Sequence, residues 1–411
     1  MLSCRFSTKN PPLSLRWTGH DLHGLGMESL LAMNTAVDME SFQQAMALHD
    51  APSANVTYAD RNGHIAFQTI GLIPDRGKGR GLVPQAGNLS GNQWNGVVEL
   101  QQMPRLTDPS AAYIAAANAR VHPGTPLVSA DNARGYRMSR LHSVLASRSD
   151  LTLDDMQALQ LDLHNSQAER LLPFMLPALS ELKDEAHVTA FRTLQSWAQK
   201  PENTRDSAGA LIGENWYPEL ARNLFGHALG DDVLTRLMQQ NYLLNHALDR
   251  LIAEETHSVW WRAERSTVLR ESFMRTIQQL SQFFGTSPET WRWDDAHSVS
   301  FVHELNGAAP FMDRWLSRGP IPWGGGNPTL GRARYSHDQP FKGRVGATVR
   351  VVAKMGEDME VRAITPGGQH GHPSSRYYDD QLDSWLKGEL DTLANSPEDV
   401  TGITTSLHPV H

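Results

Sequence analysis

Two groups of residues in this 411-residue sequence have side chains whose types and spacing suit chemistry. The first is a His-x-His pair, His370 and His372, because imidazole is a common zinc ligand. No set of cysteines or carboxylates with zinc-ligand spacing accompanies the pair, and His408 and His411 stand at the end of the sequence. This pattern does not indicate a metal centre.

The second group consists of Asn118 and Arg137. The small residues within 113–120 predict a strand that ends at Asn118. Arg137 lies in a predicted helix that starts at Tyr136. A side-chain amide is neutral and can donate hydrogen bonds to an anion, and an arginine that bonds the amide oxygen fixes the direction of the amide. Taken alone, an asparagine at a strand end is typical of a turn, and a helical arginine is typical of a surface salt bridge.

The chain is organised around a predicted β-hairpin at residues 55–70. Val56 and Tyr58 alternate with smaller residues, and the return strand alternates in the same way, which is the period of a half-buried strand. Residues 60–63 have turn composition, and Gly63 can adopt a positive φ. The pattern predicts a hairpin that leads into a loop rich in glycine and proline.

The predicted order of strand, helix, strand, long helical insert and strand indicates an α+β fold. In the helix expected after residue 151, Thr152 is a candidate N-cap and Asp155 occupies the capping-box position. The other predicted elements are a strand at 15–19, an amphipathic helix at 29–48, a mostly helical stretch at 136–285, and strands at 347–352 and 359–364.

The hairpin and its loop carry a run of motifs that resembles the penicillin acylase family of N-terminal-nucleophile amidohydrolases. Residues 55–65 read Asn-x-x-Tyr-Ala-Asp-x-Asn-Gly-x-Ile, and residues 71–76 read Gly-x-x-Pro-Asp-Arg. Val-Pro at 83–84 and Trp-Asn-Gly at 94–96 follow in the family's order. The resemblance is specific because it rests on several motifs in one order.

A closing motif extends the resemblance to the end of the chain, over about residues 13–395. Residues 368–375 read Gly-Gln-x-Gly-x-Pro-x-Ser, and residues 378–381 read Tyr-x-Asp-Gln, with Trp385 after them. The resemblance implies part of a four-layer αββα sandwich with a largely helical insert. It also implies hydrolysis of a linear amide by acyl transfer through an N-terminal nucleophile.

The resemblance assigns roles to three side chains. Asn118 matches the family asparagine that donates to the oxyanion, and Arg137 matches the arginine that orients it, although Arg134 and Arg140 are close enough for a shifted alignment. Asp131 corresponds to a calcium-ligating aspartate, since carboxylate oxygens suit hard cations. Its spacing differs from that of the family, which favours a solvated loop residue, so calcium is implied with an incomplete site.

The family's nucleophile has no match in this sequence. In the family a Ser, Thr or Cys becomes the first residue of a chain, and its own α-amine acts as the base. That residue lies far before the strand at 15–19, whereas Ser3 and Cys4 would need trimming and lack the family's spacer. We therefore expect a C-terminal portion that is inactive alone and needs a missing N-terminal part or small subunit.

The predicted organisation has five parts. They are a disordered lead-in at 1–14, a sheet-forming part of the core at 15–135, a mainly helical lobe at 136–300, returning strands with the closing motif at 301–395, and a tail at 396–411. The strands at 15–18, 55–70 and 347–364 are expected to share a sandwich. Because some partner strands are missing, an apolar strand edge is expected to be exposed.

Composition excludes some classes of function. The net charge of −8 argues against nucleic-acid partners, and no apolar run approaches the ~18–20 residues that span a membrane. Cys4 is the single cysteine, so no internal disulfide is expected. The first residues lack the apolar stretch of a secretory signal. The resemblance implies a periplasmic enzyme, whereas this chain, made as given, would be cytoplasmic.

Three functions stay open at the level of the sequence. The first is an amidohydrolase lineage with a small acyl-amide substrate, such as a β-lactam side-chain amide or an acyl-homoserine lactone. The second is a non-catalytic remnant, and the third is a binding module that uses the loop at 77–96, supported only by exposed glycines. The substrate stays open because most of the family's acyl pocket lies in parts not found here.

Overall fold

The computed structural model describes most of the chain. Ser3, Cys4, His408 and His411 lie outside the described residues, as do most of the predicted lead-in and tail. The described residues are 13–21, 26–77, 79–120, 128–254, 257–307, 309–340 and 342–400.

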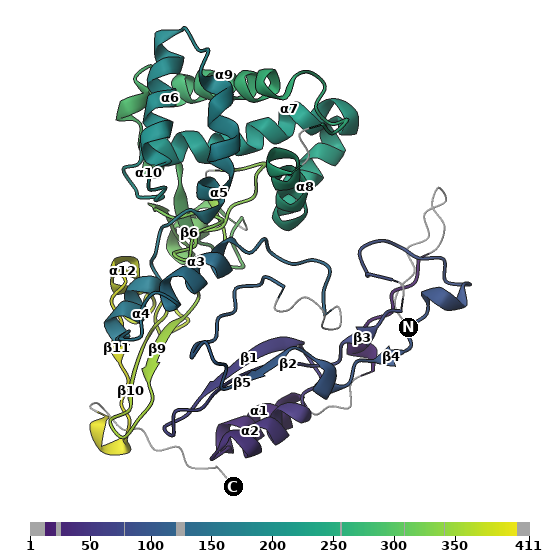
Figure 1. Cartoon of the computed structure of the whole chain (residues 1–411). Coiled ribbons are helices and arrows are strands. Elements are labelled where there is room, and N and C mark those ends of the chain that lie inside the picture. Colours follow the sequence, from purple (N-terminus) through teal and green to yellow (C-terminus); the bar gives the residue numbers. More distant parts are fainter. Residues whose placement is uncertain are drawn as a thin grey trace. The chain divides into compact units, whose positions relative to one another are not determined.

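The chain divides into two compact units, which are described one at a time (Figure 1). The N-terminal unit comprises Met1–Met138, Leu145–Ser147 and Met355–Glu357, and the C-terminal unit comprises Ser139–Val144, Arg148–Lys354 and Asp358–His411. The long helical stretch and the strands that follow it therefore belong to one unit.

The N-terminal unit begins with two helices where the sequence pattern predicts one at residues 29–48. They are α1 (Gly26–Thr35) and α2 (Met39–Ala47). The prediction of a single helix is wrong. Asp38 adopts an extended conformation and accepts a hydrogen bond from the Ser41 amide, which forms a capping box. This cap starts a new helix and interrupts the apolar periodicity.

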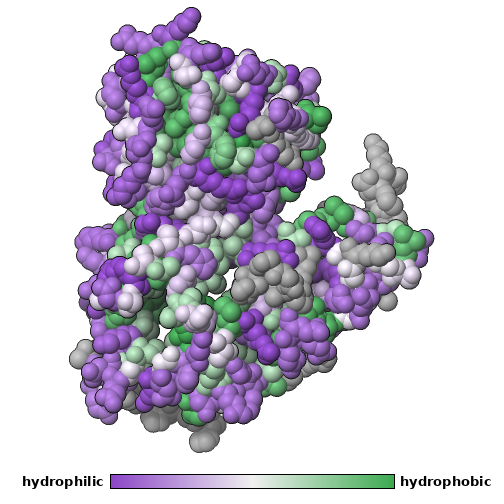
Figure 2. All heavy atoms as spheres, viewed as in Figure 1, coloured by the Kyte–Doolittle hydropathy of each residue, from purple (hydrophilic) through white to green (hydrophobic). Residues whose placement is uncertain are grey.

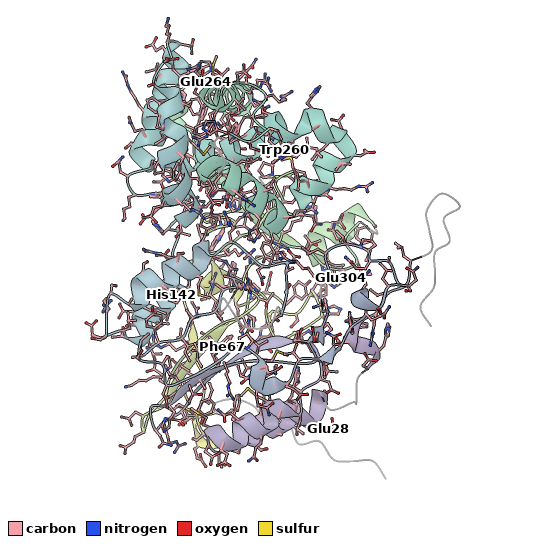
Figure 3. All side chains as sticks on the ribbon, turned by 45° about the vertical axis from the view of Figure 1, so that its right-hand side comes forward. Glu28, Phe67, His142, Trp260, Glu264 and Glu304 are labelled. Carbon is pink, nitrogen blue, oxygen red and sulfur yellow. The ribbon has the colours of Figure 1, made fainter. Side chains whose placement is uncertain are left out.

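The predicted hairpin is confirmed. Strands β1 (Ala54–Ala59) and β2 (Ile65–Ile70) pair antiparallel, and Gly63 adopts a φ of 90° in the turn between them. Strand β5 (Arg105–Thr107) adds to the other side of β2. Phe67, labelled in Figure 3, lies on this central strand and is fully buried, so the sheet carries part of the unit's core.

The rest of the N-terminal unit has little regular structure. The predicted strand at 15–19 is wrong: residues 18–20 form a 3₁₀ turn, and Leu15 and Trp17 are exposed. An extended segment becomes a strand only when its backbone finds a pairing partner, and none of the described strands pairs with this segment. The remaining elements are β3 (Pro74–Asp75), β4 (Gly96–Val97) and 3₁₀ turns at Ser90–Asn92 and Leu100–Gln102.

Helices dominate the C-terminal unit, as the sequence predicts. Thr152 caps α4 and forms the predicted capping box with Asp155. The periodic stretch at 234–251 is broken at Gln240, where α7 ends and α8 starts. The helices are α3 (Tyr136–Leu145, which begins in the N-terminal unit), α4 (Leu153–Leu159), α5 (Ser166–Met175), α6 (Glu185–Trp197), α7 (Ala208–Gln239), α8 (Asn241–Ala253), α9 (Arg265–Phe284), α10 (Trp293–Ala296), α11 (Pro310–Leu316) and α12 (Leu382–Lys387).

The core of this unit lies between α6, α7, α8 and α9. Trp216 on α7 is fully buried, its indole donates to the Ser272 hydroxyl at 2.9 Å, and its ring packs edge-on against Phe273. Trp260, labelled in Figure 3, packs edge-on against Phe225. Aromatic packing of this kind joins the helices into one core, while polar and apolar side chains mix on their outer face (Figure 2).

Two small sheets complete the C-terminal unit. The first pairs β6 (Ser298–Phe301) with β7 (Arg318–Pro322) and β8 (Lys342–Gly343). The second has the order β11 (Asp391–Thr392), β10 (Glu360–Ile364) and β9 (Arg350–Lys354), so the predicted strands near 347–364 are present. They belong to a different sheet from the hairpin.

Strand β9 lies at the edge of its sheet. Val351 in this strand and Val349 just before it are 47% and 54% exposed. Among the described helices none has the length and apolar character needed to cross a membrane.

Candidate functional site

The backbone at Asn118 differs from the predicted strand. Residues 113–120 form one isolated bridge, between Ala119 and Ala133, rather than a strand. The strand is wrong because Asn118 has a φ of 61°, in the left-handed region, and a strand does not continue through that conformation. Asparagine tolerates this region better than most residues do, so its type suits the bend.

Hydrogen bonds hold both the backbone and the side chain of Asn118. The Ala133 amide donates to the Asn118 carbonyl oxygen at 3.0 Å, next to the bridge at Ala119. Arg137, from the first turn of α3, donates from Nη2 to the Ala117 carbonyl oxygen at 3.0 Å and to Asn118 Oδ1 at 2.7 Å. The predicted contact between Arg137 and Asn118 is therefore confirmed.

The contact fixes the direction of the Asn118 amide. Arginine has donors and no acceptor, so it selects the amide oxygen and turns Nδ2 away from the guanidinium. No hydrogen bond from Nδ2 is found among the described residues, and Asn118 is exposed. The two N–H donors of this neutral amide are therefore left for other partners.

The alternative arginine on the same helix has a different role. Arg140 binds the Asp162 carboxylate through Nε, at 3.1 Å to each oxygen, and through Nη2 at 2.6 Å. This hydrogen-bonded ion pair raises the pKa of the Arg140 guanidinium above its usual value. Arg140 is committed to a structural pair, which favours Arg137 over Arg140 as the residue that orients Asn118.

Asp131 lies in the loop before α3 and is exposed. Its amide bonds the Ser129 hydroxyl at 3.0 Å, which tightens the loop. Calcium takes six to eight oxygen ligands, often including several carboxylates. The described part of the chain contains no cluster of three or more His, Cys, Asp or Glu residues suited to a metal, so a lone Asp131 does not fit a calcium site. We derive no step of the reaction through calcium.

The His-x-His pair serves local turns. The His372 amide donates to His370 Nδ1 at 3.0 Å, and the Ser374 amide donates to His372 Nδ1 at 3.2 Å. Both side chains are exposed. Each ring uses one nitrogen to satisfy the backbone, which agrees with the interpretation of this motif as a structural loop.

Sequence reasoning missed a buried polar cluster in the C-terminal unit. Glu214 on α7 accepts hydrogen bonds from Asn165 at 2.7 Å, from Asn203 at 2.8 Å and from the Tyr335 hydroxyl. Burial raises the pKa of the Glu214 carboxyl above its usual value, although these hydrogen bonds oppose that shift. The four residues are far apart in the sequence, so no local pattern could identify them.

Comparison with known proteins gives one family. The penicillin amidase family model matches residues 5–402. An acyl-homoserine lactone acylase, QuiP of Pseudomonas aeruginosa, is 24% identical over 84% of this chain and 45% of its own length. The penicillin acylase 2 proenzyme of Pseudomonas sp. strain SE83 is 26% identical over 80% of this chain and 42% of its own length.

A solved structure shows the same fold. The thermostable penicillin G acylase of Alcaligenes faecalis matches with a TM-score of 0.69 and 16% identity, over 95% of this chain and 74% of that chain. The chain spans about half the length of the curated relatives that it matches. The match of the family model over almost the whole sequence shows that this chain belongs to the penicillin amidase family.

Proposed function

We propose that the chain forms part of an amidohydrolase that cleaves a linear acyl-amide by acyl transfer through an N-terminal nucleophile. The observation that carries this proposal is the hydrogen bond from Arg137 to Asn118 Oδ1, which aims the two Nδ2 donors in a fixed direction. Family membership supplies the reaction class. Asn118 is the oxyanion donor in this proposal, and Arg137 is its positioning residue.

The chemistry assigns a clear task to Asn118. The nucleophile's oxygen or sulfur attacks the amide carbon, its proton passes to the neighbouring α-amine, and the carbonyl oxygen becomes an oxyanion. Asn118 Nδ2 donates to that oxygen without exchanging a proton. Collapse of the intermediate breaks the C–N bond, and the proton goes to the leaving amine. Water then attacks the acyl carbon and gives a proton to the α-amine. The bond from the acyl carbon to the nucleophile breaks, the nucleophile recovers its proton, and the carboxylic acid is released.

The substrate class proposed is a small acyl-amide. The relatives named above are an acyl-homoserine lactone acylase and a penicillin acylase. This chain's features support the reaction class and leave the acyl group open.

We further propose that the 411-residue chain does not hydrolyse amides by itself. Acyl transfer needs a nucleophile, a base and an oxyanion hole around one carbon, and this chain offers one donor and its positioning residue. An oxyanion hole without a nucleophile retains only about 10³–10⁴-fold acceleration over water in serine proteases. We expect no turnover of a chromogenic phenylacetyl amide or of a long-chain acyl-homoserine lactone.

The test pairs two samples. One contains the purified chain, and the other adds, in trans, the N-terminal part of a relative such as the Pseudomonas aeruginosa acylase. Turnover that requires the added part supports the proposal. Turnover by the lone chain that disappears in Asn118→Ala would show that a nucleophile lies within these residues, and Ser3 and Cys4 would be mutated next.

Calcium provides a separate prediction. Because Asp131 is exposed and lacks a cluster of carboxylates among the described residues, millimolar calcium should leave the melting temperature of the 411-residue chain unchanged. Differential scanning calorimetry with calcium and with chelator checks this. A clear calcium-dependent rise that Asp131→Asn removes would mean that Asp131 does bind the ion.

A further inference from the structure

The helical core of the C-terminal unit contains a small cavity lined by apolar and polar residues. Its volume is about 30 Å³, and it lies between α5, α6 and α7. Leu171, Met175 and Trp197 are among its apolar lining residues, and Glu214 and Tyr217 are among its polar ones. A cavity of this volume has room for about two water molecules.

His337 also lines the cavity, and its ring nitrogens have no protein partner. The side chain is 2% exposed, and neither Nδ1 nor Nε2 makes a hydrogen bond in the described part of the chain. A buried polar group left without a hydrogen bond costs about 1–3 kcal/mol. A bound molecule that forms a hydrogen bond with the His337 ring would remove this cost.

The backbone and the neighbouring rings fix His337 in place. Its amide donates to the Met238 carbonyl oxygen at 3.0 Å, and its carbonyl oxygen accepts from Arg222 at 3.3 Å. The imidazole packs against the Tyr217 and Tyr335 rings, with centroids 5.4 and 5.9 Å apart. The ring therefore cannot turn toward solvent to satisfy its nitrogens without repacking this core.

The charges around the cavity favour a neutral ligand. Burial and the nearby Arg222 lower the pKa of His337 to about 4, against a smaller opposing effect of Asp338, so the imidazole is neutral at pH 7. Glu214 also lines the cavity, and its carboxyl oxygens already accept hydrogen bonds from Asn165, Asn203 and Tyr335. A neutral imidazole has one donor and one acceptor, and a hydroxyl group can match either.

We propose that this cavity binds a small neutral molecule that carries a hydroxyl group, hydrogen-bonded to the His337 imidazole. Two sources supply that chemistry. Water can bind there alone, and a short-chain alcohol can also place its alkyl group against the apolar lining residues. The site is separate from Asn118 and does not rest on the proposed acyl-transfer function.

The experiment uses the complete 411-residue chain. A high-resolution crystal structure in aqueous buffer tests for ordered density within hydrogen-bond distance of a His337 ring nitrogen. In parallel, ethanol is titrated while the ring resonances of His337 are followed by ¹⁵N NMR. The exposed His370 and His372 serve as internal controls, and Ala168→Leu, at the cavity wall, serves as a variant that fills the space.

Ordered density at the ring together with a saturable shift of the His337 resonances supports a site that binds both water and ethanol. Density with only a linear shift, equal to that of the control histidines, supports the same site with water as its ligand. In either case Ala168→Leu should remove the density or the saturable shift. An empty cavity in the crystal and no saturable shift would overturn the proposal, and the wild-type measurements decide this even if the variant does not fold.

Discussion

In the reconstituted enzyme, Asn118→Ala should lower kcat by about 10²–10³-fold with little change in KM, because loss of one oxyanion donor has an effect of this size in other acyl-transfer enzymes. The amide donates to a charge that develops only in the transition state, so substrate binding should be spared. The measurement is steady-state hydrolysis by the chain combined with the N-terminal part of a relative.

Two further variants sharpen this prediction. Asn118→Asp keeps the shape of the side chain, replaces the donors by a carboxylate that pairs with Arg137, and should be at least as damaging. Asn62→Ala removes an amide of the same type from the hairpin turn and should leave kcat unchanged. Wild-type kcat in Asn118→Ala would remove Asn118 from the reaction.

The second large effect concerns the stability of the C-terminal unit at acidic pH. His337 binds a proton only near pH 4 in the folded chain, whereas an unfolded histidine binds one near its ordinary pKa of 6.5. Between these values the unfolded state holds more protons, so stability falls as pH falls. From pH 7 to pH 5 this side chain should lower the free energy of unfolding by about 2 kcal/mol.

The comparison of wild type with His337→Gln isolates this contribution in urea unfolding followed by tryptophan fluorescence. Glu214, whose pKa is raised by burial, acts with the opposite sign, and it is present in both proteins and cancels in the difference. His370→Ala, at an exposed turn, is the matched control and should keep the wild-type pH dependence. Equal slopes for wild type and His337→Gln would contradict the buried, neutral imidazole.

The sequence predicted structure best where the determinants are local. The hairpin follows from alternation in β1 and β2 with a turn around Gly63, and the start of α4 follows from Thr152 and Asp155, three residues apart. The same local reasoning failed at residues 29–48. The apolar period predicts one helix there, but the N-cap at Asp38 starts a second helix. Local reasoning also failed at residues 113–120, where Asn118 takes a left-handed conformation.

The candidate site was predictable only in part. The contact between Arg137 and Asn118 followed from the resemblance of motifs, and the structure places the two side chains 2.7 Å apart. The cavity at His337 was not predictable, because its lining residues come from α5, α6, α7 and a distant loop. Such a site depends on tertiary packing, which a single sequence does not show by its periodicity.

The most direct test of the proposed role of Arg137 is a double-mutant cycle in the reconstituted enzyme. If Arg137 acts only by orienting Asn118, then adding Arg137→Ala to Asn118→Ala should change kcat no further, since the group that Arg137 positions is already absent. Arg137→Ala alone should lower kcat and leave KM nearly unchanged. Equal kcat values for Asn118→Ala and the double mutant are the predicted result. Losses that multiply, as for two independent residues, would contradict the assignment.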